Sequence, residues 1–355
     1  MPLKLGDLLV KTLRPLPYFR GRARLLGALL PGSGVRTAEV GGFPLRLSLS
    51  DYIQRKIYMG CYEPRETKLV QALLRPGDTF VDAGANIGYY TAMAAGLVGP
   101  AGTVLAFEPF PELYGALQRT FAACDRVKCL SAALSDRDGQ LTLYVPPESY
   151  GNIDPSAFQY CADMREISVP ARPLTEVLTD LGVETVHLLK TDTEGFELRV
   201  LKGCEQLLGE GRIHAVLCEV NPGLLDLAGS SPKELIEYLL DRGFRLSTPY
   251  RDGDFANLLF LHGRSGIRCN LIARLDHFGK SGRTIGAGDR VCRRLREGSV
   301  SVRCGYRVGQ RANVHTDIFS RGPAVPVGAG LAQTIVASVR IRKPHQIQRT
   351  WEVVR

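Results

Sequence analysis

Two glycines, an asparagine and two acidic residues stand at spacings that suit the binding of a nucleoside. Asp82, Gly84, Asn86 and Gly88 lie in a turn between a short apolar run and a helical pattern. Glycine lets a ligand approach the backbone closely, and asparagine is among the few other residues that tolerate a positive φ. Glu108 lies 20 residues after Gly88, at the end of the next apolar run. A carboxylate there can accept both hydroxyl protons of a ribose.

The details of this turn favour S-adenosylmethionine over a dinucleotide. A dinucleotide site has the pattern Gly-x-Gly-x-x-Gly and a helix N-terminus that is open to a pyrophosphate. Here Asn86 stands at the middle glycine, and Asp82 would repel a pyrophosphate. Asp82 is suited instead to organise the turn or to meet an ammonium group through water. S-adenosylmethionine offers a ribose and an ammonium without phosphate. The alternative is a plain turn in which Asp82 only caps the helix.

A second set of candidate residues follows a later apolar run. Lys190, Asp192 and Glu194 alternate in sequence, so their side chains should face the same side at the end of a strand. Methyl transfer from S-adenosylmethionine needs alignment of the reactants and gains from a base that takes a proton from the acceptor. Asp192 is the candidate base or cofactor anchor, Lys190 could orient the acceptor or shift a neighbouring pKa, and Glu194 could bind substrate or cap the next helix. The alternative is a structural network of a lysine and carboxylates.

Metal binding is not expected. Asp192 and Glu194, with Glu219 or Asn221, could hold Mg²⁺ through oxygen ligands. None of these spacings is diagnostic of a metal site, however. We therefore predict no metal.

Three further polar residues are interpreted as structural. His187 and His214 lie in or beside apolar strand patterns, which favours core histidines over catalytic ones. Glu197 reads as a surface acid of a helix. None of the three is assigned to the site.

Strand-like and helical patterns alternate along the chain and predict an α/β fold. Such alternation indicates a doubly wound, mostly parallel sheet with helices on both faces, and ligands bind such sheets at the carboxyl ends of the strands. The long connection 146–169 is the expected substrate-facing insertion. The expected strands are 79–83, 103–107, 127–134, 141–145, 186–191, 215–220 and 256–262, and the expected helices are 3–13, 64–74, 87–97, 112–122, 198–208 and 232–242.

The positive net charge of +9 is concentrated at the end of the chain. Residues 264–355 hold 18 of the 45 basic and 5 of the 36 acidic residues, which leaves 27 basic and 31 acidic residues, net −4, in 1–263. A nucleic-acid partner is therefore not expected where the chemistry lies. The nine scattered cysteines indicate reduced thiols, and no apolar run is long enough to span a bilayer, so a cytoplasmic location is expected.

Three segments are predicted. Residues 1–50 form an N-terminal extension with a short amphipathic helix, followed by a strand or hairpin arm near 40–49. The basic, apolar start packs on the domain or makes peripheral membrane contact. Residues 51–263 form the catalytic domain. The Arg-rich tail 264–355 lacks a clear period and is expected to be poorly ordered; a shifted reading frame or a basic arm for anionic surfaces are the explanations left open.

Over roughly residues 51–262 the sequence resembles the FkbM family of S-adenosylmethionine-dependent O-methyltransferases. No single shared segment is specific, but several in the same order are. They are YMGCYEPRE (58–66), RPGDTFVDAGANIG (75–88) with FEP (107–109), AALSDRDG (132–139), LKTDTEGFE (189–197) with VLKG (200–203), and EVNP (219–222). The resemblance implies a class I methyltransferase fold, which is Rossmann-like.

The resemblance also implies roles for single residues. Gly84, Asn86 and Gly88 match the loop that wraps the methionine part of S-adenosylmethionine, and Glu108 matches the ribose acid. Asp136 would meet the adenine edge, although a Ser-Asp turn that caps a hairpin is the alternative. Glu63 would lie over the amino-acid end of the cofactor or be an exposed acid at a helix start.

The implied acceptor is a hydroxyl of a small molecule, a sugar or a glycolipid. The alternatives are an RNA methyltransferase that uses the basic tail, and a catalytically idle binding protein that keeps the fold. The tail has few aromatic residues to stack on bases, which argues against the first alternative.

Overall fold

The computed structural model of the protein describes residues 5–13, 21–147, 155–159, 163–248, 250 and 254–265. The expected Arg-rich tail lies, from residue 266 onward, outside the described residues, as do parts of the expected substrate-facing insertion. All statements below concern the described residues.

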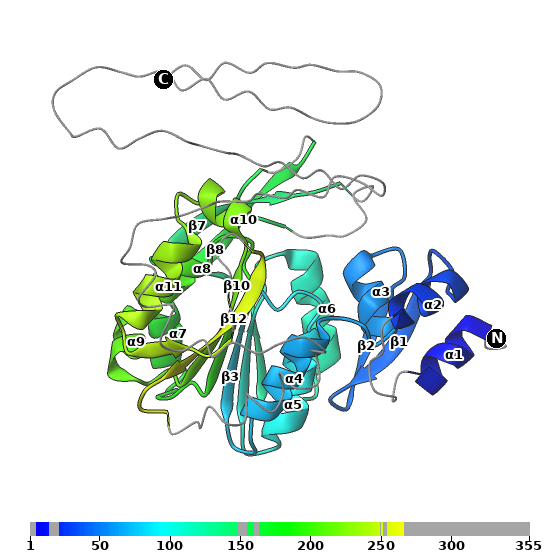
Figure 1. The fold of residues 1–355 in the computed structure, drawn as a ribbon, viewed down its shortest axis with the longest axis horizontal. Coiled ribbons are helices and arrows are strands. Elements are labelled where there is room, and N and C mark those ends of the chain that lie inside the picture. The colour runs from blue at the N-terminus through cyan, green and yellow to red at the C-terminus, as the bar shows by residue number, and fades with distance from the viewer. Residues whose placement is uncertain are drawn as a thin grey trace, which may run out of the picture. The chain divides into compact units, whose positions relative to one another are not determined.

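A seven-stranded sheet forms the centre of the domain (Figure 1). Its strands are β3 (Thr79–Ala83), β4 (Thr103–Phe107), β5 (Val127–Leu130), β9 (Leu188–Thr191), β10 (Ala215–Val220), β11 (Phe244–Leu246) and β12 (Ala256–His262). Their order is β11-β12-β10-β9-β3-β4-β5, and β12 runs antiparallel to both of its neighbours. Every residue of β10 is buried, as expected for a strand that is covered on both faces. The predicted mostly parallel sheet is confirmed.

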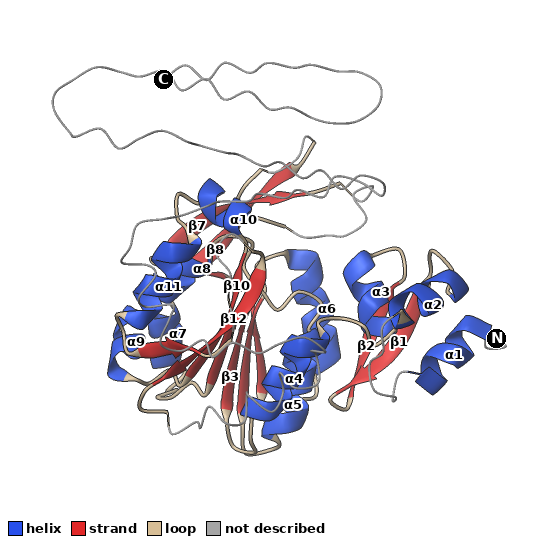
Figure 2. Ribbon diagram, in the orientation of Figure 1, coloured by secondary structure: helices blue, strands red, loops and turns tan. Residues whose placement is uncertain are grey.

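Helices cover both faces of this sheet, as Figure 2 shows. One face carries α4 (Pro64–Leu73), α5 (Tyr89–Val98) and α6 (Pro111–Phe121). The other face carries α7 (Leu174–Asp180), α8 (Glu197–Lys202), α9 (Glu205–Glu210) and α11 (Pro232–Leu240). The short helix α10 (Pro222–Leu227) follows β10. Two apolar clusters, one on each face, therefore make the doubly wound arrangement.

The structure divides two segments that the sequence pattern presents as continuous. The extended run 127–134 becomes β5 of the central sheet and β6 (Ala133–Leu134) of a second sheet, whose order is β6-β8-β7 with β7 (Gly139–Val145) and β8 (Arg165–Arg172). The expected helix 198–208 becomes α8 and α9. They divide at Gly203, where a Cβ would lie 2.0 Å from the carbonyl oxygen of Ser135, so the chain packs too closely there for another residue type.

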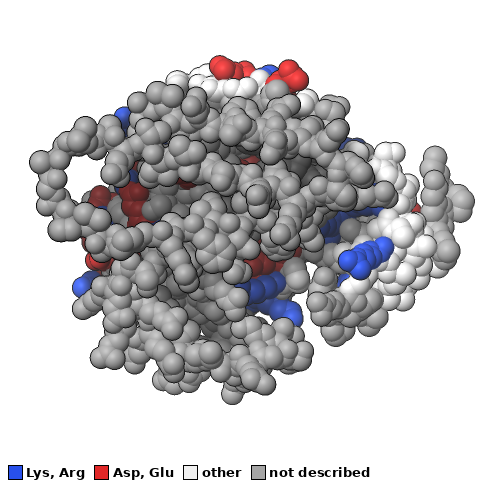
Figure 3. Space-filling model, turned by 45° about the horizontal axis from the view of Figure 1, so that its top comes forward, with Lys and Arg blue, Asp and Glu red and all other residues white. Residues whose placement is uncertain are grey.

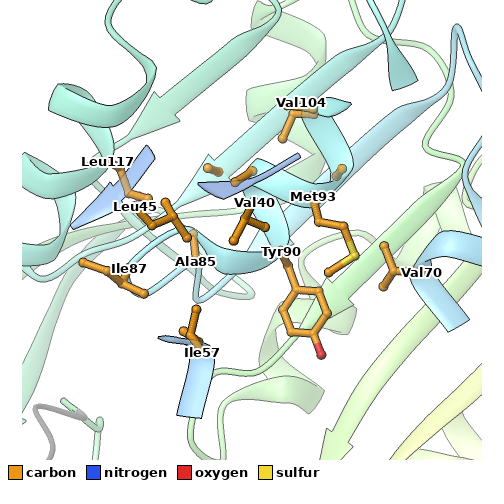
Figure 4. Packing of buried hydrophobic residues seen from close by; sticks show 14 of the residues in the cluster. Val40, Leu45, Ile57, Val70, Ala85, Ile87, Tyr90, Met93, Val104 and Leu117 are labelled. Atoms are coloured by element: carbon orange, nitrogen blue, oxygen red, sulfur yellow. The ribbon is translucent and has the colours of Figure 1, made fainter. Parts of the chain in front are cut away.

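The described part of the N-terminal extension shares a core with the domain. It consists of α1 (Leu5–Leu13), α2 (Arg22–Leu29) and the hairpin of β1 (Val35–Val40) and β2 (Phe43–Ser48), and α3 (Tyr52–Tyr58) follows it at the start of the domain. Figure 4 shows Val40 and Leu45 of the hairpin among side chains of the domain such as Met93 and Leu117. The Phe43 ring packs edge-on against Phe121 of α6 at a centroid distance of 5.0 Å.

Basic and acidic side chains of the described residues both appear on the face drawn in Figure 3. Among the described helices, none is both long and apolar enough to cross a membrane. The described cysteines Cys61, Cys124, Cys129, Cys204 and Cys218 are free thiols.

Candidate active site

The chain order of the strands creates a switch point between β3 and β9. From β3 the chain adds β4 and β5 on one side, and it later adds β9 and β10 on the other side. Open α/β sheets bind ligands at the carboxyl ends of the strands at such a point. Ala83 and Thr191, the last residues of β3 and β9, are register partners. The turn after β3 and the loop after β9 therefore begin side by side.

The turn after β3 is tied to the predicted ribose acid. Gly84 and Asn86 have φ values of 82° and 50°, in the left-handed region that the sequence predicted for this turn. The backbone N–H of Asn86 donates to Oε2 of Glu108 over 2.8 Å, and the N–H of Phe110 donates to Oε1 over 2.9 Å. These bonds fix the Glu108 carboxylate, which is only 5% exposed, beside the turn.

Contacts within the protein already require both glycines of the turn. A Cβ on Gly84 would lie 1.9 Å from the carbonyl oxygen of Asp192, and a Cβ on Gly88 would lie 2.6 Å from Cδ2 of Leu117. Gly84 thus brings the turn after β3 against the loop after β9. Gly88 serves the packing of α6 against the turn.

A pocket opens between the turn after β3, the end of β4 and the loop after β9. The empty space within it is about 610 Å³, a volume that includes space open to solvent. The lining brings together predicted residues from both halves of the sequence, since it includes Gly84, Asn86, Glu108, Asp192 and Glu194. The remaining lining is mostly apolar and includes Phe107, Pro109, Leu113, Ala132, Ala133, Leu134, Leu141, Leu143, Pro155, Ala157, Thr193 and Phe196.

Asp82 lies beneath this pocket and is not part of its lining. Its side chain is buried, and Oδ2 accepts a hydrogen bond of 2.7 Å from Oγ1 of Thr91 in α5. Oδ1 has no hydrogen-bond partner among the described residues. Burial raises the pKa of Asp82 to about 6, against the opposing effects of Lys190 and Thr91. Asp82 therefore links β3 to α5 through Oδ2, while its buried Oδ1 could accept a further hydrogen bond.

Lys190 is a buried ammonium that holds Asp192. Its side chain is 3% exposed, and Nζ lies 2.7 Å from Oδ2 of Asp192. Burial opposes the charge, but Asp192, Asp82 and Glu63 together raise the pKa of Lys190 above its ordinary value. The lysine is therefore charged, and Asp192 has a fixed cationic partner. Asp192 faces the pocket while Lys190 does not.

Three carboxylates converge at the mouth of this half of the site. Each of Asp192, Glu194 and Glu219 contributes one carboxylate oxygen, and these three oxygens lie within 4.8 Å of one another. Such a group could hold a divalent cation. Asn221, the other ligand considered from the sequence, uses its Oδ1 to accept the N–H groups of Gly223 and Leu224 at the start of α10. The expectation of no metal remains a prediction.

The interpretation of Glu197 as a surface acid was wrong. Its side chain is fully buried, and Oε1 accepts the backbone N–H groups of Thr193 and Gly195 over 2.8 and 3.2 Å. Burial raises its pKa to about 7, against the effect of these hydrogen bonds. The loop after β9 turns back through Glu194 and Gly195, both at positive φ, and this turn brings its N–H groups onto the acid. Glu197 is thus a support of the site loop.

Asp136 does not reach the pocket lining. Its Oδ1 lies 3.4 Å from Nη1 of Arg199 and accepts a hydrogen bond from Ser135. It lines a separate hollow with Arg199 and Lys202. Ala132, Ala133 and Leu134, which precede Asp136 in the chain, do line the pocket.

The two histidines lie away from the site. His187 accepts the N–H of Thr79, at the start of β3, on Nδ1 and approaches Asp78 with Nε2. Its ring packs against His214. Both lie toward the amino ends of the parallel strands, opposite the pocket, in line with their interpretation as structural residues.

One residue near Lys190, Tyr90, was missed, and its contact with Glu63 was not predicted. The phenol of Tyr90 donates a hydrogen bond of 2.6 Å to Oε2 of Glu63, and Nζ of Lys190 lies 4.8 Å from the centre of the Tyr90 ring. The only signal in the sequence was the position of Glu63 before Pro64 in the family-like segment 58–66. Nothing in the pattern linked it to a residue over a hundred positions later.

Comparison with known proteins agrees with the geometry of this site. A model of the Methyltransferase FkbM domain matches residues 82–246. Methyltransferase sdnD of Sordaria araneosa is 35% identical over 162 residues, which are 37% of this chain and 62% of that protein. The 31-O-demethyl-FK506 methyltransferase FkbM of Streptomyces tacrolimicus is 33% identical over 200 residues, which are 48% and 74% of the two chains. Hexuronic acid methyltransferase AglP of Haloferax volcanii is 26% identical over 226 residues, 61% and 86% of the two.

The extent of these matches differs among the relatives. The chain spans less than two thirds of the length of sdnD but about three quarters of the Streptomyces protein. The matched region contains the turn after β3, Glu108 and the loop after β9. The chain belongs to the FkbM family of S-adenosylmethionine-dependent methyltransferases.

Proposed function

We propose that the protein transfers the methyl group of S-adenosylmethionine to a hydroxyl oxygen of a small molecule or a sugar. The observation that carries the proposal is a single pocket that is lined by Glu108 and the Gly84–Asn86 turn on one side and by Asp192 and Glu194 on the other. A nucleoside-binding half and an acidic half thus face one cavity. The names of two relatives, a 31-O-demethyl-FK506 methyltransferase and a hexuronic acid methyltransferase, fit acceptors of this kind.

The residues present suit this cofactor. Glu108 is fixed by two backbone N–H groups in the position of an acceptor for ribose hydroxyls. The apolar wall of Leu113, Ala133 and Leu134 suits a flat base. The buried Oδ1 of Asp82, which has no hydrogen-bond partner among the described residues, would be satisfied by an ammonium group or by a water bound to one.

The chain's own residues would supply alignment and a proton acceptor. The bound cofactor supplies a methyl group on a positively charged sulfur. Asp192 would accept the hydroxyl proton of the acceptor or orient that hydroxyl, and Lys190 would hold the Asp192 carboxylate in place. Glu194 also lines the pocket and would contact the acceptor. Positioning alone can supply a large part of the acceleration.

A screen with methyl-labelled S-adenosylmethionine tests the proposal. The panel contains a macrocyclic polyketide alcohol, neutral and acidic methyl glycosides, and total RNA. Label is expected in a polyketide or sugar as a base-stable methyl ether. Label in RNA alone would contradict the proposal. A third outcome is that calorimetry shows cofactor binding, that no member of the panel is methylated, and that Asp192→Asn behaves as the unchanged protein. This outcome would indicate a catalytically idle binding protein.

A further inference from the structure

We propose that Glu63 and Tyr90 are positioning residues that hold the Lys190 ammonium on Asp192 and away from Asp82. The inference rests on the proposed function, because it assigns the pair a part in the same site. Glu63 lies outside the region matched by the family model, which begins at residue 82, so the proposal extends the site beyond that region.

Lys190 has two carboxylates within its reach. Asp82 is its register partner on the neighbouring strand β3, and Asp192 is two residues further along its own chain. Both acids raise the pKa of Lys190, so both attract its charge. The Nζ atom bonds Oδ2 of Asp192, whereas Oδ1 of Asp82 has no hydrogen-bond partner in the part of the chain that the structure describes. Something must therefore favour Asp192 over a competing acid on the adjacent strand.

The ring of Tyr90 lies against the lysine head group. The centre of the ring is 4.8 Å from Nζ, within the range of a cation–π contact. Tyr90 belongs to the first turn of α5, and its side chain is 4% exposed. Figure 4 shows its ring extending from the apolar cluster with the hydroxyl at the far end. The ring is a fixed wall beside the ammonium.

Glu63 fixes that wall and adds charge behind it. Its Oε2 accepts the Tyr90 hydroxyl over 2.6 Å, a short distance that is typical of a charge-assisted bond. The carboxylate also contributes to the raised pKa of Lys190. The backbone of Glu63 has a φ of 35° directly before Pro64, a conformation that costs energy in a residue other than glycine. The strained backbone of Glu63 thus accompanies the placement of its side chain against Tyr90.

The consequence for the site concerns the orientation of Asp192. An ammonium that moved to Asp82 would leave Asp192 without the partner that fixes its carboxylate in the pocket wall. Residues 63 and 90 touch Lys190 or its neighbours rather than the pocket, since neither is in its lining. They act through the lysine.

Three variants of the full-length protein test this role. Tyr90→Phe keeps the ring and removes the hydroxyl, and Glu63→Gln keeps an acceptor and removes the charge. The matched control is Tyr89→Phe, because the hydroxyl of this neighbouring tyrosine forms a hydrogen bond with the hydroxyl of Thr67. Three quantities are measured for each: the ¹⁵N resonance of the Lys190 ammonium in the absence of cofactor, kcat at saturating cofactor and acceptor, and the cofactor Kd.

We expect the first two variants to shift the Lys190 resonance and to lower kcat about tenfold, the scale of one hydrogen bond to a charged group. Their cofactor Kd should change less than about threefold, and Tyr89→Phe should change none of the three. An unchanged resonance or an unchanged kcat in both variants overturns the positioning role. Asp192→Asn in the same assay tests the proposed function separately, because its loss of kcat does not depend on Glu63 or Tyr90.

Discussion

The two halves of the pocket are held in place by different kinds of interaction. On the side of β3 and β4, the Glu108 carboxylate is fixed by backbone N–H groups of two short turns. On the side of β9, Asp192 is fixed by the buried ammonium of Lys190. The groups around this ammonium come from β3, from α5 and from the segment before α4. The first half is local in sequence, and the second is assembled from distant parts.

This difference suggests a division of work. Backbone donors are rigid and carry no ionisable group, so they suit a surface that must recognise the same nucleoside every time. A buried lysine among carboxylates can fix the position of a carboxylate that acts as a base, and proton transfer requires such a base. Damage to the first half should therefore appear in cofactor affinity, and damage to the second half in turnover.

Asp192→Asn should have the largest effect. We expect kcat to fall by about 10²–10⁴, because asparagine keeps the size of the side chain but is a poor proton acceptor. The cofactor Kd should change much less. Steady-state kinetics at saturating cofactor, together with calorimetry, separates the two quantities.

The unfolding midpoint of this variant must be measured as well. Loss of one partner of a buried ion pair costs roughly 3–5 kcal/mol in unfavourable cases. The opposite pattern, a large loss of affinity with near-normal turnover, would make Asp192 an anchor for the cofactor and would break the division proposed here.

Glu197→Gln should change the pH dependence of stability. The native state holds a proton on Glu197 up to about pH 7, whereas an ordinary glutamate releases it near 4.5. The contribution of this group to stability is therefore complete below about pH 4.5 and is lost as pH rises through 7. The shift corresponds to about 3 kcal/mol, and Asp82 adds a change of the same sign.

Urea unfolding between pH 4.5 and 8 measures this effect. The unfolding free energy of the unchanged protein should fall over this range, and it should fall less in Glu197→Gln, whose amide oxygen can still accept the N–H groups of Thr193 and Gly195. Parallel curves for the two proteins would show that Glu197 is charged in the native state across this pH range, and would contradict its raised pKa.

Glu108→Ala should weaken cofactor binding by about 1.5–3 kcal/mol, the scale of charge-assisted hydrogen bonds, or roughly 10- to 150-fold. Titration calorimetry measures it. Glu112→Ala is the matched control, because this acid on the next helix is exposed and pairs with Arg165. Unchanged affinity in a folded Glu108→Ala protein would remove Glu108 from the nucleoside half.

The same contrast explains what could be predicted from the sequence. Gly84, Asn86 and Glu108 could be singled out because the turn after one parallel strand lies beside the end of the next strand. The spacing of these residues in the sequence is therefore informative. The alternation of apolar runs likewise predicted the strands of the central sheet except β11, and the helices α4, α5, α6 and α11 beside them, but it did not predict α7 or α10. Asp192 and Glu194 were singled out because they directly follow the apolar run that forms β9.

Burial and long-range contact could not be predicted in this way. Glu197 has the sequence context of an exposed helical acid, and only the turn at Glu194 and Gly195 brings backbone donors onto it. Glu63 and Lys190 are neighbours in space through the packing of α4, α5 and β9, which no local period encodes. Gly203 divides a continuous helical pattern because of a backbone contact with Ser135.

Asp136→Ala should have the smallest effect, and it tests the boundary of the nucleoside half. The resemblance suggested that Asp136 meets the adenine edge, but in the structure it pairs with Arg199 outside the pocket lining. Both side chains are about one third exposed, and such pairs contribute roughly 0–1 kcal/mol. We therefore expect the cofactor Kd to change by less than about threefold. Arg199→Ala removes the same ion pair and should give the same small change. A tenfold loss of affinity in Asp136→Ala but not in Arg199→Ala would mean that the acid itself contacts the cofactor, and that the nucleoside half depends on a side chain brought from outside its turns.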